Sequence, residues 1–389
     1  MLKVQEFIRG NTDWECLLSS EPYCISISED TVNGRDLVLL KYDQLNSDLG
    51  NEIVQECRGL ILDAHTFEVV SYPFNKFFNY GESHAASIDW RTAYVTEKLD
   101  GSIIKVVNMD GHFLISTNGV IDAFKCNLPE NVGCPFNSFG ELVMEGFKFY
   151  GIKVEDFPRL FAPGFTYIFE LTSPWNQVVV RWNETKMNFI GVRDNASCKE
   201  TFFADHPLAE VFDTPKIFPI RSIDECVAAA KVLPEDTEGY VVVDKDFNRI
   251  KVKSPRYIQL HYMAGNQTWS PTRVLEILRA NEVSEYIVYF PQFKAAFDVV
   301  KAKYDAYVDE LEDVKEAIDN LLEVEWNITK KDFAKWVFTI NTIRPHSGFA
   351  FSYFDSVYAK TKKDDALVRS VDEYLAKMTT TKLVETLGL

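Results

Sequence analysis

The chain has 389 residues, of which 46% are hydrophobic and 25% are charged, and its formal net charge is −17. This length allows two or three domains, and the composition excludes a disordered chain. The acidic balance argues against a protein that coats nucleic acid, but an enzyme that gathers its cations in one groove can still bind RNA with a modest, salt-sensitive affinity.

The sequence also argues against membrane insertion, export and a structural zinc site. No uninterrupted apolar run is long enough to span a bilayer, and residues 1–6 lack the basic-then-apolar pattern of a signal peptide. The 7 cysteines are odd in number and no two form a CxxC pair, which favours reduced thiols. We therefore expect a cytoplasmic monomer without a membrane partner.

The first predicted elements are strands joined by short turns. Residues 36–46 read as a strand with Tyr42 near its end, and residues 55–63, which contain Arg58, lead into a hairpin with residues 68–72. A segment with Lys76 among aromatic side chains follows. Short connections between neighbouring strands favour antiparallel pairing.

The sequence KLDGSI at residues 98–103 lies between two further predicted strands, residues 93–97 and 104–107. Asp-Gly between such runs predicts a tight turn, because glycine accepts a positive φ without steric cost. The turn would present Lys98 at the end of a strand. A free lysine has a pKa near ~10.4, so an amine that attacks phosphorus needs burial or nearby cations to favour its neutral form. We therefore expect further cations to converge on Lys98.

The next elements continue the strand-rich pattern. Residues 108–112 predict a second hairpin turn, and residues 141–147 a helix. Strands are then predicted in four places, the last of which is a hairpin: residues 167–171, 178–180, 188–192, and 238–243 with 249–253.

Helices are predicted for the last third of the chain. Residues 271–290 and 364–387 read as helices, and residues 329–332 resemble a helix cap. From residue 293, apolar residues recur at alternating steps of four and three, which predicts a helix of roughly thirty residues. We therefore expect an α+β chain, with an antiparallel-sheet domain at residues 1–257 and an all-helical domain at residues 258–389.

Several charged residues fall on or beside the predicted strands. Lys251 and Lys253 share one strand face and repel unless an anion or solvent lies between them. Each charge has a commoner explanation by itself: a lysine beside a turn is usually solvated, the lysine pair can line the wet face of an edge strand, and Glu170 can pair with Arg58 in a core. Together they favour one anion-binding groove.

These motifs resemble those of the covalent nucleotidyltransferases, which include DNA ligases, RNA ligases and capping enzymes. KLDG at residues 98–101 is similar to the nucleotidyl-lysine motif, and FEL at 169–171, EGYVV at 238–242 and KVK at 251–253 resemble later motifs. The flanks ECRG at 56–59 and KFFN at 76–79, with Tyr257, resemble T-even phage RNA ligases of the tRNA-repair type. The resemblance spans about residues 36–261.

The resemblance implies an ATP-grasp-like adenylyltransferase domain and a three-step reaction. Lys98 would take AMP from ATP, AMP would pass to the 5′-phosphate of an RNA end, and a 3′-hydroxyl would displace it. The family's catalytic roles fall on Lys98, Lys251, Lys253 and Tyr257. Its nucleotide-binding roles fall on Tyr42, Arg58, Lys76, Lys98, Glu170, Glu238, Lys251 and Lys253. Mg²⁺, or Mn²⁺ in its place, would bind at Glu238 and, through water, at Glu170.

One segment departs from the family, and several alternatives stay open. Residues 114–119 lack the basic residue that the family often carries there, and Asn118 is a neutral candidate. DNA ligases and capping enzymes usually follow KxK with a β-barrel, so the predicted helices favour an RNA ligase. The resemblance also implies a role in phage tail-fibre attachment, for which the apolar stripe from residue 293 to 321 could serve a partner, although packing within its own domain is the simpler explanation.

The resemblance further implies that the helical domain grips a nicked tRNA anticodon loop in the host cytoplasm, if the chain is phage-encoded. Four cations interleaved with aromatic residues around residues 330–344 are typical of single-strand binding. They are Lys330, Lys331, Lys335 and Arg344, with Phe333, Trp336 and Phe338 between them. An ordinary amphipathic helix with a solvated basic face explains the same pattern equally well.

Overall fold

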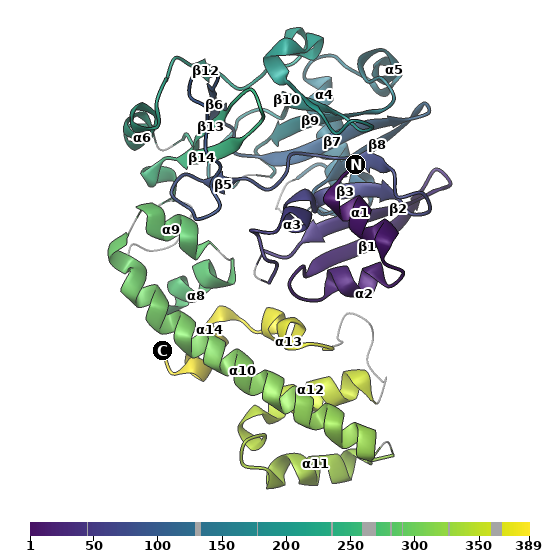
Figure 1. Ribbon diagram of the computed structural model, residues 1–389, viewed down its shortest axis with the longest axis vertical. Helices are drawn as coiled ribbons and strands as arrows, with labels where there is room; N and C mark the ends of the chain where they lie inside the picture. Colours follow the sequence, from purple (N-terminus) through teal and green to yellow (C-terminus); the bar gives the residue numbers. More distant parts are fainter. Residues whose placement is uncertain are drawn as a thin grey trace. The chain divides into compact units, whose positions relative to one another are not determined.

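The structure is a computed structural model of residues 1–389 (Figure 1). It describes residues 1–44, 46–128, 134–176, 178–234, 236–258, 270–280, 282–289, 291–325, 327–358 and 368–389. The chain divides into two compact units, Met1–Asn266 and Gln267–Leu389. The predicted domain boundary after residue 257 adjoins residues 259–269, which lie outside the described residues, as does the end of the resembling stretch at residue 261.

The first unit contains three sheets. The first has the order β1–β2–β3–β4, with strands β1 (Ile25–Val32), β2 (Arg35–Tyr42), β3 (Arg58–Asp63) and β4 (Val69–Ser71). The second has the order β11–β10–β9–β7–β8, with β7 (Ser102–Met109), β8 (His112–Thr117), β9 (Phe165–Thr172), β10 (Lys186–Asp194) and β11 (Glu200–Phe202). Neighbouring strands in both sheets are antiparallel.

The third sheet has the order β12–β6–β13–β14–β5, with β5 (Phe78–Asn79), β6 (Tyr94–Lys98), β12 (Ile217–Phe218), β13 (Gly239–Val243) and β14 (Arg249–Lys253). Its pairs are antiparallel except for β14 with β5. The predicted fold class is confirmed: antiparallel sheets carry the first unit and helices the second.

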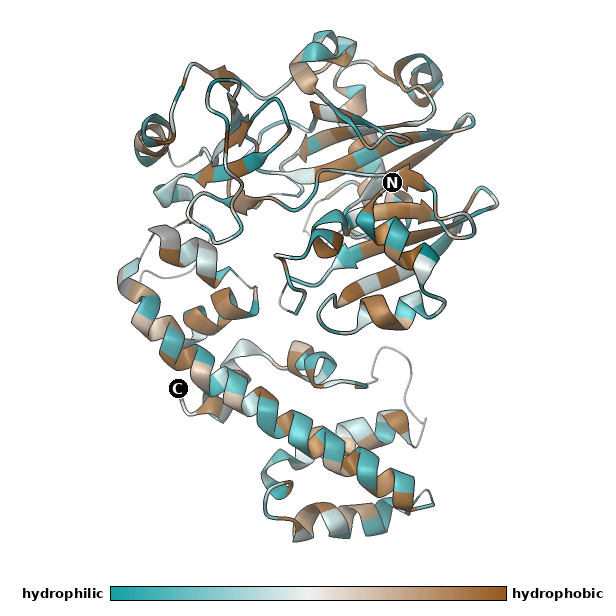
Figure 2. Ribbon diagram, in the orientation of Figure 1, coloured by the Kyte–Doolittle hydropathy of each residue, from teal (hydrophilic) through white to brown (hydrophobic). Residues whose placement is uncertain are grey.

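Helices pack on the sheets of the first unit through apolar side chains. They are α1 (Lys3–Gly10), α2 (Trp14–Ser19), α3 (Glu52–Glu56), α4 (Phe139–Lys148), α5 (Phe157–Leu160) and α6 (Ile223–Lys231). Helix α4 begins at Ser138, whose side chain accepts a hydrogen bond from the Glu141 amide, and it buries Leu142 and Phe147 in a phenylalanine-rich core over β9 and β10. Figure 2 shows that apolar residues dominate these strands.

The connection from β6 to β7 corrects one prediction. The two strands around Asp100 and Gly101 do not pair, because β6 belongs to the third sheet and β7 to the second. Gly101 lies against β9 at this crossing, where a Cβ atom would come within 2.2 Å of the Leu171 carbonyl oxygen. Glycine is therefore needed here for close packing between sheets rather than for a hairpin turn. The second turn is a hairpin, with Asp110 and Gly111 at positive φ between β7 and β8.

The predicted strand at residues 178–180 is also wrong. These three valines form an irregular segment outside the named strands. Their amide groups are used otherwise, because Val179 and Val180 both donate hydrogen bonds to the Asp100 carboxylate. Three consecutive valines favour a strand, and their sequence does not show that a distant carboxylate accepts hydrogen bonds from their amides.

The second unit is helical throughout its described elements. They are α8 (Pro271–Arg279), α9 (Val283–Tyr289), α10 (Lys294–Val324), α11 (Lys330–Thr339), α12 (Ser347–Val357), α13 (Val371–Lys377) and α14 (Thr380–Leu387). The long helix and the Thr329 cap are confirmed. The helix predicted over residues 271–290 is two shorter helices, α8 and α9. The helix predicted over residues 364–387 is also two, α13 and α14, which are separated by Met378 and Thr379 in extended conformation.

The apolar stripe of α10 packs within its own unit. Figure 2 shows hydrophobic and hydrophilic bands alternating along this helix. Its buried residues, which include Phe297, Leu311 and Ile318, face neighbours of which α8 and α12 are the main ones. The stripe is therefore core rather than a surface for a partner. No helix among the described residues is both long and apolar enough to cross a membrane.

Candidate functional site

A cavity of about 340 Å³ is lined by residues of β3, β6, β9, β13 and β14. Its volume lies in the range of pockets that hold small-molecule ligands. Six of the charged residues singled out from the sequence line it or lie at its edge: Arg58, Lys98, Glu170, Glu238, Lys251 and Lys253. Strands from all three sheets thus bring together residues that are up to 195 positions apart in sequence, from Arg58 to Lys253.

Lys98 ends β6 and is held by Glu238. Its Nζ donates a hydrogen bond of 2.7 Å to Glu238 Oε2, and Lys253 Nζ lies 3.5 Å from Glu238 Oε1. The arrangement follows from the strand register, because Gly239 pairs with Lys98 on one side and with Lys253 on the other. Gly239 has φ +148°, and a Cβ atom there would lie 2.3 Å from the Val252 carbonyl oxygen. Glu238, only 4% exposed, is therefore fixed between two lysines.

Cations and an aromatic ring form one wall of the cavity. The Phe77 ring lies 5.4 Å from the Arg58 guanidinium and 5.6 Å from Lys251 Nζ. Arg58 also donates a hydrogen bond of 3.4 Å to the Phe74 carbonyl. This wall can receive an anion, since cations that share a confined site gain from a negative ligand between them.

Glu170, on β9, is the carboxylate on the opposite sheet. Burial, together with the negative charge of Glu238, raises the pKa of Glu170 to about 7, although the charge of Lys98 opposes the rise. At neutral pH the group is therefore present in both protonated and ionised forms. In its protonated form it can donate a hydrogen bond, which an ordinary surface glutamate does not do.

Apolar side chains also line the cavity. Besides Phe77 they include Phe202, Phe203, Val241 and Val243, of which Val241 pairs with Lys251 and Val243 with Arg249 across β13 and β14. Aromatic rings and charges in one cavity suit a ligand that has a flat apolar group and an anionic tail. These apolar residues were not predicted as site residues, because aromatic and β-branched residues also fill ordinary cores.

Asp100 lies behind Lys98 and is turned away from it. Its carboxylate, 4% exposed, accepts hydrogen bonds from the amides of Val179 and Val180, at 2.9 and 2.7 Å, and from the Tyr257 hydroxyl at 2.8 Å. Trp182 Nε1 donates to the Asp100 carbonyl at 2.7 Å. Tyr257 is thus buried under the Lys98 turn and is not among the described residues that line the cavity.

Two other predicted residues lie outside this cavity. Lys76 lines a neighbouring cavity, and its Nζ lies 5.2 Å from the Tyr42 ring and 5.6 Å from the Phe78 ring. Tyr42 packs against Lys76 and is absent from the lining of both cavities as far as the structure describes them. The structure therefore does not bring Tyr42, Lys76 and Tyr257 into direct contact with the Lys98 cavity.

Lys105 was missed by sequence reasoning. It lies on β7, fully buried, and its Nζ donates a hydrogen bond to the Gly59 carbonyl. Burial, with the charge of Arg58 nearby, lowers the pKa of Lys105 to about 7. The sequence signal that could have identified it is a lysine in the middle of the apolar strand IIKVV, which indicates a buried charge. Asn118, the neutral residue in the segment that departs from the family, does line the cavity, and its buried Oδ1 has no hydrogen-bond partner among the described residues.

The carboxylates beside Lys98 fit a magnesium site only in part. Among the described residues there is no group of three or more His, Cys, Asp or Glu side chains that could hold a metal ion. Glu170 and Glu238 supply carboxylate oxygens, and Mg²⁺ commonly takes one or two of these together with water and substrate phosphates. The residues present therefore fit a metal that arrives with a polyphosphate.

Comparison with known proteins places the chain in a family. A family model described as RNA ligase matches residues 56–257, just over half of the chain. The chain is 28% identical over 291 residues to a protein of Autographa californica nuclear polyhedrosis virus named as a bifunctional polynucleotide kinase/RNA ligase, and the match covers 70% of this chain and 39% of that protein. The chain thus spans about two fifths of that relative's length.

Two further relatives carry RNA ligase names. The RNA ligase of Rhodothermus phage RM378 is 24% identical over 327 residues, which cover 66% of this chain and 70% of the phage protein. An archaeal ATP-dependent RNA ligase structure covers 76% of this chain and 78% of its own, at 14% identity and a TM-score of 0.46. Because the family model matches more than half of the residues, including the Lys98 motif, the chain belongs to the RNA ligase family.

Proposed function

We propose that the protein is an ATP-dependent RNA ligase that joins 5′-phosphate and 3′-hydroxyl RNA ends through adenylate intermediates. The observation that carries the proposal is the Lys98 cavity, in which the amine at the end of β6 meets the cations Arg58, Lys251 and Lys253 and the carboxylates of Glu170 and Glu238. Membership of the RNA ligase family supports RNA as the substrate.

Lys98 is the proposed nucleophile of the first step. Its Nζ loses a proton and forms a bond to the α-phosphorus of ATP, while the bond from that phosphorus to the bridging oxygen breaks and pyrophosphate leaves. Glu238 Oε2, at 2.7 Å from Nζ, is within reach of this proton. Glu238 thus aims the amine at rest and can accept its proton when phosphate enters.

The cations of the cavity stabilise the charge that develops on phosphorus. Lys251 and Lys253 project from one face of β14, and Arg58 faces them across Phe77. Such preorganised groups are commonly worth ~10²–10³ in rate. A magnesium ion bound at Glu238 and Glu170 would supply additional neutralisation of the phosphates.

The aromatic side chains of the cavity would receive adenine, and Glu170 would receive ribose. The rings of Phe202 and Phe203 offer flat contacts to a base. Glu170, with its pKa raised to about 7, can accept or donate a hydrogen bond to a ribose hydroxyl.

The two later steps transfer AMP and seal the strand. A 5′-phosphate oxygen of the RNA attacks the α-phosphorus and Lys98 leaves as the amine. A 3′-hydroxyl oxygen then attacks the RNA phosphorus, loses its proton, and AMP leaves. Tyr257 would act on these steps by positioning, because its hydroxyl holds Asp100 two residues after Lys98. Lys76, with Tyr42 against it, would contact RNA or nucleotide phosphate from outside the cavity.

The proposed natural substrate is a nicked tRNA loop in the cytoplasm of a phage host. The helical unit would bind this tRNA. The predicted basic face of that unit is less open than its sequence indicates, however. Lys330 Nζ donates to Asp355 at 2.6 Å, Lys335 Nζ donates to Asp332 at 2.8 Å, and Phe333 is fully buried. The structure therefore favours the amphipathic-helix explanation for this helix, and other parts of the unit would have to contact the tRNA.

A joining assay with labelled ATP tests the proposal. The protein is incubated with magnesium and ATP labelled in its α-phosphate, and one portion is denatured to look for retained label. A second portion is kept folded and is given RNA with 5′-phosphate and 3′-hydroxyl ends. We expect label on the denatured protein and, with RNA, release of labelled AMP together with circular or joined RNA. Parallel reactions with GTP and with DNA ends separate a ligase of RNA from a capping enzyme or DNA ligase. Label from GTP alone, or sealing of DNA alone, would contradict the proposal.

A further inference from the structure

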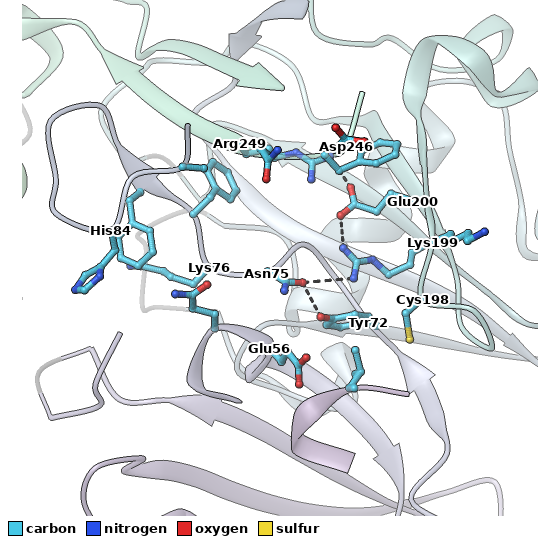
Figure 3. Close-up of a pocket in the computed structure, with 18 residues that line it drawn as sticks. Glu56, Tyr72, Asn75, Lys76, His84, Cys198, Lys199, Glu200, Asp246 and Arg249 are labelled. Atoms are coloured by element: carbon cyan, nitrogen blue, oxygen red, sulfur yellow. Dashed lines mark hydrogen bonds and ion pairs between the residues drawn. The ribbon is translucent and has the colours of Figure 1, made fainter. Parts of the chain in front are cut away.

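A second, larger cavity adjoins the Lys98 cavity in the first unit. Its volume is about 670 Å³, and two residues, Phe77 and Arg249, line both cavities. Figure 3 shows Arg249, Glu200, Asn75 and Tyr72 arranged around its interior. The proposed adenylation chemistry uses the first cavity, so the second has no role in it.

A buried ion-pair chain forms the inner wall of this cavity. Arg193 and Glu200 are direct partners across β10 and β11, where Arg193 Nη2 contacts Glu200 Oε1. Arg249, on β14, reaches Glu200 Oε2 at 2.5 Å. All three side chains are at most 9% exposed, so two buried guanidinium groups share one carboxylate. The wall carries an excess positive charge in a place where burial makes it costly.

One donor of this wall has no partner among the described residues. Arg193 Nε is buried and makes no hydrogen bond with them, although Nη1 of the same group donates to Asn75 Oδ1 at 3.4 Å and the guanidinium lies 3.9 Å from the Tyr72 ring. A buried donor that lacks an acceptor costs free energy, so the described groups of the protein do not fully satisfy this cation.

The carboxylates of the lining neutralise this charge only in part. The lining has four cationic side chains, Lys76, Arg193, Lys199 and Arg249, against the three carboxylates of Glu56, Glu200 and Asp246. Asp246 is in addition paired with Lys245 at 2.9 Å. The cavity is therefore suited to a ligand with negative charge.

Aromatic rings complete the lining. Tyr72, Phe77, Phe78 and Phe247 lie among the cations. Stacking rings beside positive charges are how proteins hold single-stranded nucleic acid without reading its sequence, because every base has a π-face and every nucleotide a phosphate.

We propose that this second cavity holds a nucleotide of a single-stranded RNA end and delivers that end to the Lys98 cavity. The inference rests on the proposed RNA ligase function and adds a substrate subsite to it. Since Phe77 and Arg249 belong to both linings, an RNA end in the second cavity would lie next to the adenylation site.

The variant Asn75→Asp tests the subsite with little change of shape. It places a negative charge beside Arg193 and Tyr72 while keeping the oxygen that accepts both hydrogen bonds. The control Asn33→Asp makes the same charge change in the exposed turn between β1 and β2. Binding of a fluorescent single-stranded RNA is measured by anisotropy at several salt concentrations, and sealing is measured with pre-adenylated RNA.

We expect Asn75→Asp to weaken RNA binding about tenfold, independently of sequence, and to lower the slope of log affinity against log salt by about one phosphate's contribution. Label transfer from ATP to Lys98 should change less than twofold, and Asn33→Asp should match the wild type. Binding is measured with two RNAs, one that has a 5′-phosphate and a blocked 3′ end and one that has only a free 3′-hydroxyl. The RNA whose binding Asn75→Asp weakens carries the end that occupies the cavity.

Equal RNA binding by the two variants would overturn the proposal, as would a loss of self-adenylation without a loss of RNA binding, which would assign the cavity to ATP. If the wild type fails to take label from ATP, the ligase function fails but the anisotropy comparison still decides whether the cavity binds RNA.

Discussion

The two units of the chain differ in the charges that they bury. The first unit encloses several of them: Lys105 and Glu238 are almost fully buried, and Lys98 forms an ion pair with Glu238. In the second unit the lysines singled out from the sequence stay at the surface, where Lys330 and Lys335 are more than 60% exposed and paired with aspartates. Burying a charge costs free energy, whereas an exposed ion pair contributes at most about 1 kcal/mol. Buried charges are therefore the better guide to chemistry in this protein.

The largest expected effect comes from removing one cation of the Lys98 cavity. Lys251→Met should slow formation of the protein–AMP adduct by ~10²–10³, because a preorganised charge near the reacting phosphorus is lost. Rates of label uptake from ATP measure this. Lys231→Met, at the exposed end of α6, is the matched control and should leave the rate unchanged. Equal rates of label uptake by Lys251→Met and Lys231→Met would show that Lys251 does not act in the adenylation site.

The next effect is on stability and concerns Glu170. Its pKa is about 7 in the folded chain against 4.5 as the usual value, so the folded state binds more protons between these values. Stability from this group is thus present below pH 4.5 and is lost as pH rises through about 7, by roughly 3 kcal/mol. Glu170→Gln should remove that loss. The free energy of unfolding in urea, taken as variant minus wild type, should therefore increase from pH 4.5 to pH 7.5. A pH-independent difference would show that the group is not buried as described.

A smaller effect is expected for the support of the Lys98 turn. Tyr257→Phe removes one hydrogen bond to the buried Asp100 carboxylate and should cost about 2 kcal/mol in the free energy of unfolding. Tyr240→Phe, in another buried tyrosine of the first unit, serves as the control and should cost less than about 0.5 kcal/mol. Similar losses in both variants would mean that the Tyr257 hydroxyl does not hold Asp100.

The smallest effect is expected in the helical unit. Lys335→Ala breaks an exposed pair within α11 and should change the free energy of unfolding by at most about 0.5 kcal/mol, with RNA sealing unchanged. Phe333→Ala, in the same helix but fully buried, should cost about 3–5 kcal/mol. Loss of RNA sealing in Lys335→Ala would show that α11 contacts RNA. It would then contradict the view that the functional charges are the buried ones of the first unit.

The sequence was informative where periodicity and spacing decide the structure. Strand alternation placed Lys251 and Lys253 on one face, and the four-and-three spacing predicted α10. The break between α13 and α14 was not predicted, although Ser370 and Thr379, which cap the two helices, are residue types that favour helix starts. These are local signals.

Features that depend on contacts between distant segments were not predictable in the same way. The crossing at Gly101 requires knowing that Leu171 lies against it, and the amides of Val179 and Val180 become a cap only because Asp100 lies beside them. Motif order indicated that Arg58, Lys98 and Lys253 share a site. No local pattern separates Tyr42 and Lys76 from that site, because their positions depend on how distant segments pack together: Tyr42 ends β2 of the first sheet, and Lys76 precedes β5 of the third.

The most direct measurement is to locate AMP on the protein. After incubation with ATP and magnesium, the denatured chain is digested and its peptides are analysed by mass spectrometry, beside the charge-conserving variant Lys98→Arg. The account predicts one AMP on the peptide that contains Lys98 and none on any peptide of the variant. AMP on another lysine such as Lys105 or Lys251, or an equal yield from Lys98→Arg, would contradict it.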